Sequence, residues 1–183
     1  MKRYLLVPVA IVIVCVIALT SWISLTHEGN TQVPMRTVTD ATGTTIVIPE
    51  HPKRVVILNS SNLDMYYVVG GTVVGKPTSS YISKEIMAKT KDVPSVGTLH
   101  SPSVETIIGL HPDLVIGINV PFNTSLRDIL AQADIPLYIN DLDTYDDVVT
   151  TLTFFGELTN QPDVAKATAD KAVANYNKLV DDT

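Results

Sequence analysis

Two short stretches of the chain carry the side chains that are best suited to bind a ligand. Residues 74–81 end in hydroxyl side chains and a tyrosine, and residues 92–105 place His100 just before a helix that we expect to open at Pro102. Hydroxyl groups, free backbone N–H groups and an imidazole at one rim suit an anionic, metal-containing ligand. The predicted ligand-binding residues are Ser60, Ser61, Asn62, Thr78, Ser79, Ser80, Tyr81, Thr98 and Asn119.

The same residue types also have common structural uses, which compete with a role in binding. Serine and threonine usually cap helices or complete turns, and either Ser60 or Ser61 is a candidate cap for the helix that follows. The competing assignment for Tyr81 is a partly buried loop aromatic, and for His100 it is an ordinary surface histidine. The four histidines of the chain show no paired spacing, which argues against a zinc cage.

Alternating strands and helices are expected to position these residues. Residues 36–39 and 44–48 are rich in β-branched side chains around a turn at Gly43, so we expect a small hairpin. Residues 54–58 form a continuous apolar run, which a parallel strand buried on both faces requires. Further strands are expected at 73–74, 114–117 and 137–139, and helices at 62–69, 102–110, 123–133 and 145–158.

This order of elements predicts a fold of the α/β class that is built on a Rossmann-like parallel sheet. Ligands of such sheets bind outside the carboxyl ends of the strands. The segments that follow those ends are 59–61, 76–81 and 119–121, and they contain most of the predicted binding residues. A long helical pattern from Asp163 to Val180 completes the chain, and no strand follows it.

The composition argues against two classes of function. The chain has 19 acidic and 13 basic residues and a formal net charge of -6, so we expect no nucleic-acid partner. It contains no nucleophile elbow, no phosphate-binding glycine loop and no His-Glu-x-x-His motif, so we do not expect an enzyme. The single cysteine, Cys15, cannot form an internal disulfide.

The first 25 residues predict export of the protein. Lys2 and Arg3 precede an uncharged segment from Tyr4 to Leu25, which is long enough to cross the hydrocarbon core of a bilayer. The positive flank should stay in the cytoplasm, so the folded part should lie at the extracytoplasmic face. We expect residues 1–25 to be an uncleaved anchor, with a cleaved secretory signal as the alternative, and residues 26–35 to be a tether.

Several sequence blocks resemble a known family in their order and spacing. The runs RTVTDATG (36–43), PSVE (102–105) and LHPDLVI (110–116) resemble the first half of the substrate-binding proteins of ABC importers for iron siderophores, cobalamin and heme. That resemblance implies two α/β lobes joined by a long helix, with the ligand between the lobes. Residues 36–160 would then be the N-terminal ligand-binding lobe of a periplasmic-binding-protein fold, residues 161–183 would begin the inter-lobe helix, and the second lobe would be absent.

Within this group, the runs VGKPTS (74–79) and KDVP (91–94) most resemble the heme-receptor lipoproteins of the iron-regulated surface determinant system. The resemblance implies that each lobe supplies one axial ligand to heme iron. His100 falls where those proteins place a methionine, and imidazole is a common iron ligand, so His100 is the predicted axial ligand. Glu105 matches the glutamate that docks the permease in the family.

The sequence therefore predicts a membrane-tethered substrate-binding component of an ABC importer, with heme as the transported ligand and an ABC permease as the partner. A receptor for an iron siderophore or cobalamin is the alternative within this class. A single-lobe interaction or sensor protein without uptake activity is the alternative from another class.

Overall fold

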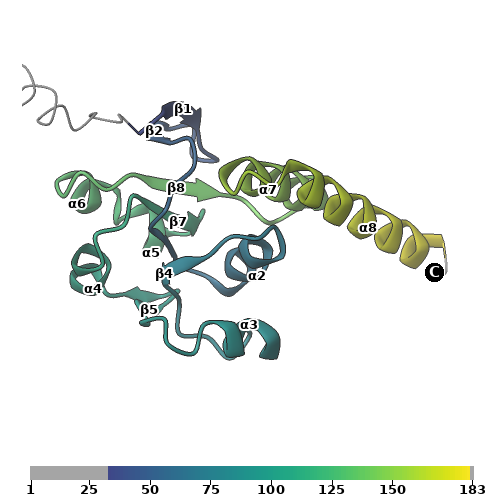
Figure 1. Ribbon diagram of the computed structural model, residues 1–183, viewed down its shortest axis with the longest axis horizontal. Coiled ribbons are helices and arrows are strands. Elements are labelled where there is room, and N and C mark those ends of the chain that lie inside the picture. Colours follow the sequence, from purple (N-terminus) through teal and green to yellow (C-terminus); the bar gives the residue numbers. More distant parts are fainter. Residues whose placement is uncertain (1–32, 182–183) are drawn as a thin grey trace, which may run out of the picture. The chain divides into compact units, whose positions relative to one another are not determined.

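A four-stranded parallel sheet lies at the centre of the computed structural model, which describes residues 33–181 (Figure 1). Its strands are β3 (Val55–Ile57), β4 (Val73–Gly75), β7 (Leu114–Ile118) and β8 (Leu137–Asn140), in the order β4-β3-β7-β8. In the parallel register, Val55 lies opposite Leu114 and Val115 lies opposite Leu137. The predicted α/β class with a parallel sheet is confirmed.

Helices cover both faces of this sheet. Val55 and Ile57 belong to the apolar core that is shared with α2 (Ser60–Val68) and α7 (Tyr145–Leu158). Val56 and Leu58 belong to a second core, shared with α4 (Val104–Gly109) and α6 (Arg127–Ala131). Successive side chains of a strand point to opposite faces, and all four of these residues are at most 1% exposed. Burial on both faces explains the continuous apolar run in the sequence.

The predicted N-terminal hairpin is confirmed. It consists of β1 (Met35–Thr39) and β2 (Thr45–Pro49), which pair antiparallel. The Asp40 carboxylate holds the turn, because it accepts the backbone N–H groups of Thr42 at 2.9 Å and of Thr44 at 3.1 Å. The Ala41 N–H donates to the carbonyl of Ile139 in β8 at 2.9 Å, which attaches the hairpin to the sheet.

The segment between β4 and α4 contains three short elements that the sequence did not predict: α3 (Lys84–Lys89), β5 (Gly97–Thr98) and β6 (Ser101–Pro102). The expectation that Pro102 opens a helix was wrong, because Pro102 lies in β6. α4 begins at Val104 and is capped by Ser103, whose hydroxyl oxygen accepts the N–H of Thr106 at 3.3 Å.

The helix predicted at 123–133 is divided into α5 (Pro121–Thr124) and α6. The N–H of Leu126 donates to the carbonyl of Asn123, three residues back, at 3.1 Å. This tighter bond interrupts the regular four-residue pattern of an α-helix. The chain therefore turns between the two helices instead of continuing as one.

The last helix, α8 (Pro162–Asp181), begins against α7 and continues past it (Figure 1). Ala165 and Ala169 are 1% and 6% exposed, so the first turns of α8 pack against α7. Gly156 of α7 permits the close approach, because a Cβ at this position would lie 2.3 Å from the Cβ of Ala165. That residues 161–183 begin an inter-lobe helix stays a prediction.

The predicted anchor at residues 4–25 lies outside the described residues, as does most of the predicted tether. Met35 already belongs to β1, so the folded part begins slightly earlier than the predicted boundary at residue 36. Among the helices of residues 33–181, none combines the length and the apolar character that are needed to cross a membrane.

Candidate functional site

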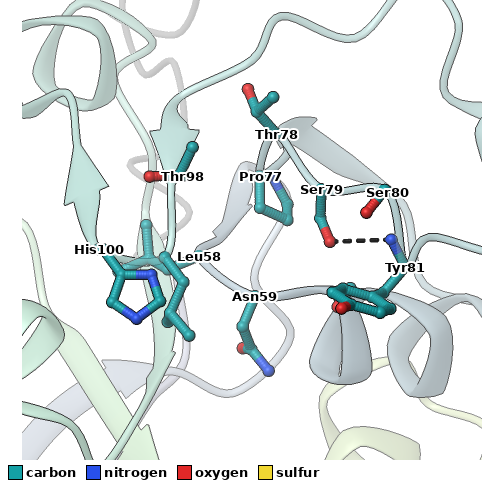
Figure 2. A pocket seen from close by; sticks show the side chains of 11 residues that line it. Leu58, Asn59, Pro77, Thr78, Ser79, Ser80, Tyr81, Thr98 and His100 are labelled. Atoms are coloured by element: carbon teal, nitrogen blue, oxygen red, sulfur yellow. Dashed lines mark hydrogen bonds between the residues drawn. The ribbon is translucent and has the colours of Figure 1, made fainter.

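A cavity of about 310 Å³ lies at the carboxyl end of the sheet (Figure 2). Three chain segments form it: one follows β3, one follows β4, and one contains the turn between β5 and β6. The chain runs from β3 to β4 on one side of β3 and then crosses back to β7 on its other side, and such reversal points form a crevice in open α/β sheets. The lining residues are Leu58, Asn59, Ser60, Pro77, Thr78, Ser79, Ser80, Tyr81, Thr98, Leu99 and His100.

Most of the predicted binding residues line this cavity, namely Ser60, Thr78, Ser79, Ser80, Tyr81, Thr98 and His100. Ser61 and Asn119 are exposed but are not among the described residues that line it. Glu105 is also exposed, in the first turn of α4. The two neighbouring loops are held together by a hydrogen bond between the hydroxyls of Thr78 and Ser95.

Asn62 has a different place from the one that the sequence suggested. Its side chain is fully buried, and its Nδ2 donates to Oδ1 of Asn140 at 2.8 Å. In return, Nδ2 of Asn140 donates to Oδ1 of Asn62 and to the hydroxyl of Thr151, both at 2.9 Å. These bonds join α2 to β8 and α7, so the Asn62 amide is committed to the core instead of the cavity.

His100 lies at the tip of a two-residue hairpin. β5 and β6 pair antiparallel, with Gly97 opposite Pro102 and Thr98 opposite Ser101, which leaves Leu99 and His100 as the turn. Gly97 has a positive φ of 96°, and a Cβ there would lie 2.4 Å from the carbonyl oxygen of Ser101. Only glycine fits this position without strain. The turn therefore carries His100 outward at the edge of the cavity.

Two residues of α5 hold the hairpin tip. The His100 ring packs edge-on against the ring of Phe122, with the centroids 5.1 Å apart. Asn123 is fully buried; its Oδ1 accepts the N–H of Ile118 at 3.0 Å, and its Nδ2 donates to the carbonyl of Leu99 at 3.5 Å. Neither residue was predicted from the sequence.

Figure 2 shows His100 and Tyr81 on opposite sides of the cavity. Tyr81 is 86% exposed, so the alternative of a partly buried loop aromatic does not hold. The Tyr81 N–H donates to the hydroxyl of Ser79 at 3.1 Å, which orders the loop that carries the ring. Two ring side chains thus flank an opening whose walls carry hydroxyl groups.

Asn59 lines the cavity and lies in the predicted segment 59–61, but it was not among the predicted binding residues. It occupies the N-cap position of α2 in an extended conformation, yet its side chain makes no cap hydrogen bond. The residue is only 6% exposed, and its Oδ1 has no hydrogen-bond partner among the described residues. The predicted caps, Ser60 and Ser61, are instead the first two residues of the helix. An unpaired buried amide oxygen and an uncapped helix N-terminus therefore meet at the cavity.

The side chains and the helix N-terminus at this site offer two kinds of contact to a ligand. Within residues 33–181, no three His, Cys, Asp or Glu side chains converge in a way that could hold a metal ion. His100 can supply one ligand to an iron whose other positions are filled, as in a porphyrin. The hydroxyls and the backbone N–H groups of α2 can bind oxygen atoms of the same ligand.

Comparison with known proteins gives a consistent result. A family model described as periplasmic binding protein matches residues 55–183. The chain is 30% identical to the iron(3+)-hydroxamate-binding protein YxeB of Bacillus subtilis over 159 residues, which are 85% of this chain and 44% of that protein. It is 29% identical to the Fe(3+)-citrate-binding protein YfmC of the same organism over 149 residues, 80% of this chain and 46% of that protein.

A solved structure of Staphylococcus aureus IsdE complexed with heme shares the fold. It superposes with a TM-score of 0.60 and 24% sequence identity, over 69% of this chain and 47% of that chain. The chain thus covers less than half the length of each of these three proteins.

Proposed function

Since this chain belongs to the periplasmic binding protein family, we propose that it forms the N-terminal ligand-binding lobe of the substrate-binding component of an ABC importer for an iron chelate. The observation that carries this proposal is the cavity at the carboxyl end of the sheet, where hydroxyls, two rings and a free amide meet. The names of the two Bacillus relatives, which specify ferric hydroxamate and ferric citrate, support iron chelates as the substrate class.

Heme is the first ligand that we propose, because His100 lies where it could bind heme iron as an axial ligand. Its imidazole lies at an exposed hairpin tip beside the cavity, and Phe122 packs against one edge of the ring. A second axial ligand would come from outside this lobe. The free N–H groups at the start of α2 could receive a propionate, since helix N-termini bind carboxylates.

An iron siderophore is the second candidate, and the hydroxyl-rich loop at 78–80 favours it. A siderophore fills the coordination sphere of its iron, so the lobe would contact only the organic shell. His100 and Tyr81 would then serve as packing surfaces. This difference in the role of His100 separates the two candidates experimentally.

We propose that the lobe works at the extracytoplasmic face of the membrane, held there by residues 4–25. Glu105 is the proposed contact with the permease, because it is exposed on α4 and does not line the cavity. A carboxylate in this position is free to pair with a basic residue of a partner protein.

The test is a titration of the full chain with hemin and with ferrichrome, a ferric hydroxamate. A Soret band that shifts on binding supports heme. Quenching of protein fluorescence by ferrichrome, without any shift of the Soret band by hemin, supports the siderophore alternative. If neither hemin nor ferrichrome binds at micromolar concentration, both of these ligand assignments are wrong.

A further inference from the structure

We infer that this lobe recognises an uncharged ligand surface, so that the porphyrin plane of heme or a neutral ferric hydroxamate binds in preference to a polyanionic citrate or catecholate chelate. This inference rests on the proposed function and narrows its ligand class. It also revises the anionic ligand that the sequence suggested.

The first observation is the placement of the positive charges. Among the described residues, no lysine or arginine lines the cavity. Lys76 precedes the lining residue Pro77, but its side chain is committed elsewhere. Its Nζ donates to the carbonyl of Thr90 at 2.5 Å and to the hydroxyl of Thr90 at 3.1 Å, and the residue is 9% exposed. Lys76 therefore caps the C-terminal end of α3, where a positive charge is stabilising.

The described arginines also have partners away from the cavity: Arg36 pairs with Glu157, Arg127 pairs with Asp40, and Arg54 donates to the carbonyls of Leu110 and His111. A polyanionic chelate that entered the cavity would lose hydration and would find no full positive charge on its described lining residues in return. The net charge of -6 on the whole chain adds long-range repulsion.

The second observation is the chemistry of the groups that do line the cavity. Asn59 presents a buried and unpaired amide oxygen, which needs a hydrogen-bond donor. The peptide N–H groups of ferrichrome are such donors, whereas a citrate carboxylate oxygen is itself an acceptor and cannot pair with the Asn59 oxygen. The N-terminus of α2 supplies only about half a positive charge, which suits a carbonyl oxygen or one carboxylate better than a polyanion.

Apolar side chains complete the uncharged lining. Leu58, Pro77 and Leu99 also line the cavity, and they can pack against a porphyrin plane or an aliphatic siderophore chain. Neutral hydrogen-bonding groups set among apolar walls are the usual arrangement of a small-molecule pocket. The cavity thus selects by shape and hydrogen bonding more than by charge.

The experiment measures the affinity of the full chain for four iron-loaded probes: hemin, ferrichrome, ferric citrate and ferric enterobactin, which is a catecholate chelate. We expect hemin or ferrichrome to bind at least about tenfold more tightly than either polyanionic probe. His100→Ala then distinguishes the two favoured ligands, since it should weaken the binding of hemin far more than the binding of ferrichrome.

The second part of the experiment introduces a positive charge into the cavity by substitution. Ser80 is exposed and lines the cavity, whereas Gln132 is exposed outside it. Ser80→Lys should raise the affinity for ferric citrate relative to ferrichrome by about tenfold. Gln132→Lys adds the same charge elsewhere and should leave that ratio close to its wild-type value.

Two results would overturn the inference: a wild-type preference for ferric citrate or ferric enterobactin, or an equal effect of Ser80→Lys and Gln132→Lys. Either result would leave the proposed chelate-binding function intact. Failure of all four probes to bind would instead refute that function, and the inference with it.

Discussion

The ring of His100 lies edge-on to the ring of Phe122, with the centroids 5.1 Å apart and the planes inclined at 69°. Edge-to-face ring pairs contribute about 0.5–1.5 kcal/mol, so the contact restricts the imidazole at the tip of an otherwise exposed turn. A metal ligand benefits from such restriction, because its orientation is fixed before the metal arrives.

The first prediction concerns His100 and heme. His100→Ala should abolish or greatly weaken hemin binding, whereas His100→Met should retain it with shifted Soret and charge-transfer bands, because a thioether is a softer ligand than imidazole. Absorption spectra of the ferric and ferrous forms measure both effects.

His111 provides the matched control for this prediction. It is exposed and lies between α4 and β7, away from the cavity. Its φ of 46° is left-handed, so asparagine is the suitable replacement, since it tolerates this region better than alanine. His111→Asn should leave the spectrum unchanged. An unaltered spectrum for His100→Ala would remove the axial-ligand assignment and favour the siderophore.

The second prediction separates two asparagines at the start of α2. Asn59→Leu removes an unpaired buried amide, so the free energy of unfolding should stay constant or rise by about 1 kcal/mol, while ligand affinity falls. Asn62→Leu leaves the buried Oδ1 of Asn140 without its hydrogen-bond donor and should cost about 1–3 kcal/mol. Urea unfolding and ligand titration of both variants provide the measurement. Equal destabilisation by the two changes would show that Asn59 has a structural partner.

Local patterns were sufficient to predict much of the fold. The helix expected at 145–158 coincides with α7, because Thr144 and Asp147 form a capping box that fixes its start. Ligands of parallel sheets bind at the carboxyl ends of the strands, which predicted a site at the loops after β3 and β4. Both loops do line the cavity. Both inferences depend on residues close in sequence or on a general property of the sheet.

The errors arose where a contact joins distant parts of the chain. Asn62 was predicted to bind the ligand. Its true hydrogen-bond partner, Asn140, lies 78 positions away, so the sequence did not indicate the contact that holds Asn62 in the core. Phe122 gave no sequence signal that linked it to His100. Asn59 could have been noticed, because it follows an apolar strand and precedes a helix. However, asparagine and serine have similar N-cap preferences, so propensity could not rank it against Ser60 or Ser61.

The third prediction concerns acid stability at the hairpin turn. Burial raises the pKa of Asp40, but hydrogen bonds from Thr42, Arg127 and Thr44 outweigh burial and hold the pKa below its usual 3.8. A carboxyl group with a lowered folded-state pKa stabilises the protein above pH 3.8, and this contribution is lost as the pH falls through the folded-state value. The wild-type free energy of unfolding should therefore fall as the pH drops below about 4.

Asp40→Asn tests this pH dependence, because it removes the titrating group and keeps the shape of the side chain. Its unfolding free energy should be lower than that of the wild type at neutral pH, and the difference should shrink in acid. Urea unfolding followed from neutral pH to about pH 3 gives the two profiles. Parallel profiles would show that Asp40 does not contribute to acid sensitivity.

The last prediction tests how firmly α8 is held against α7. A Cβ at Gly156 would lie 2.3 Å from the Cβ of Ala165 and 3.1 Å from the carbonyl oxygen of Gln161. Gly156→Ala should therefore force α8 away from α7, cost about 1–3 kcal/mol, and speed amide exchange in the first turns of α8.

Gly109 is the matched control for Gly156, because it is the last residue of α4 and a Cβ there would meet nothing within 4 Å. Gly109→Ala should be neutral or stabilise the protein by up to about 1 kcal/mol. Urea unfolding and hydrogen exchange of both variants measure the difference. If Gly156→Ala were as stable as Gly109→Ala, α8 would not pack on α7 in solution.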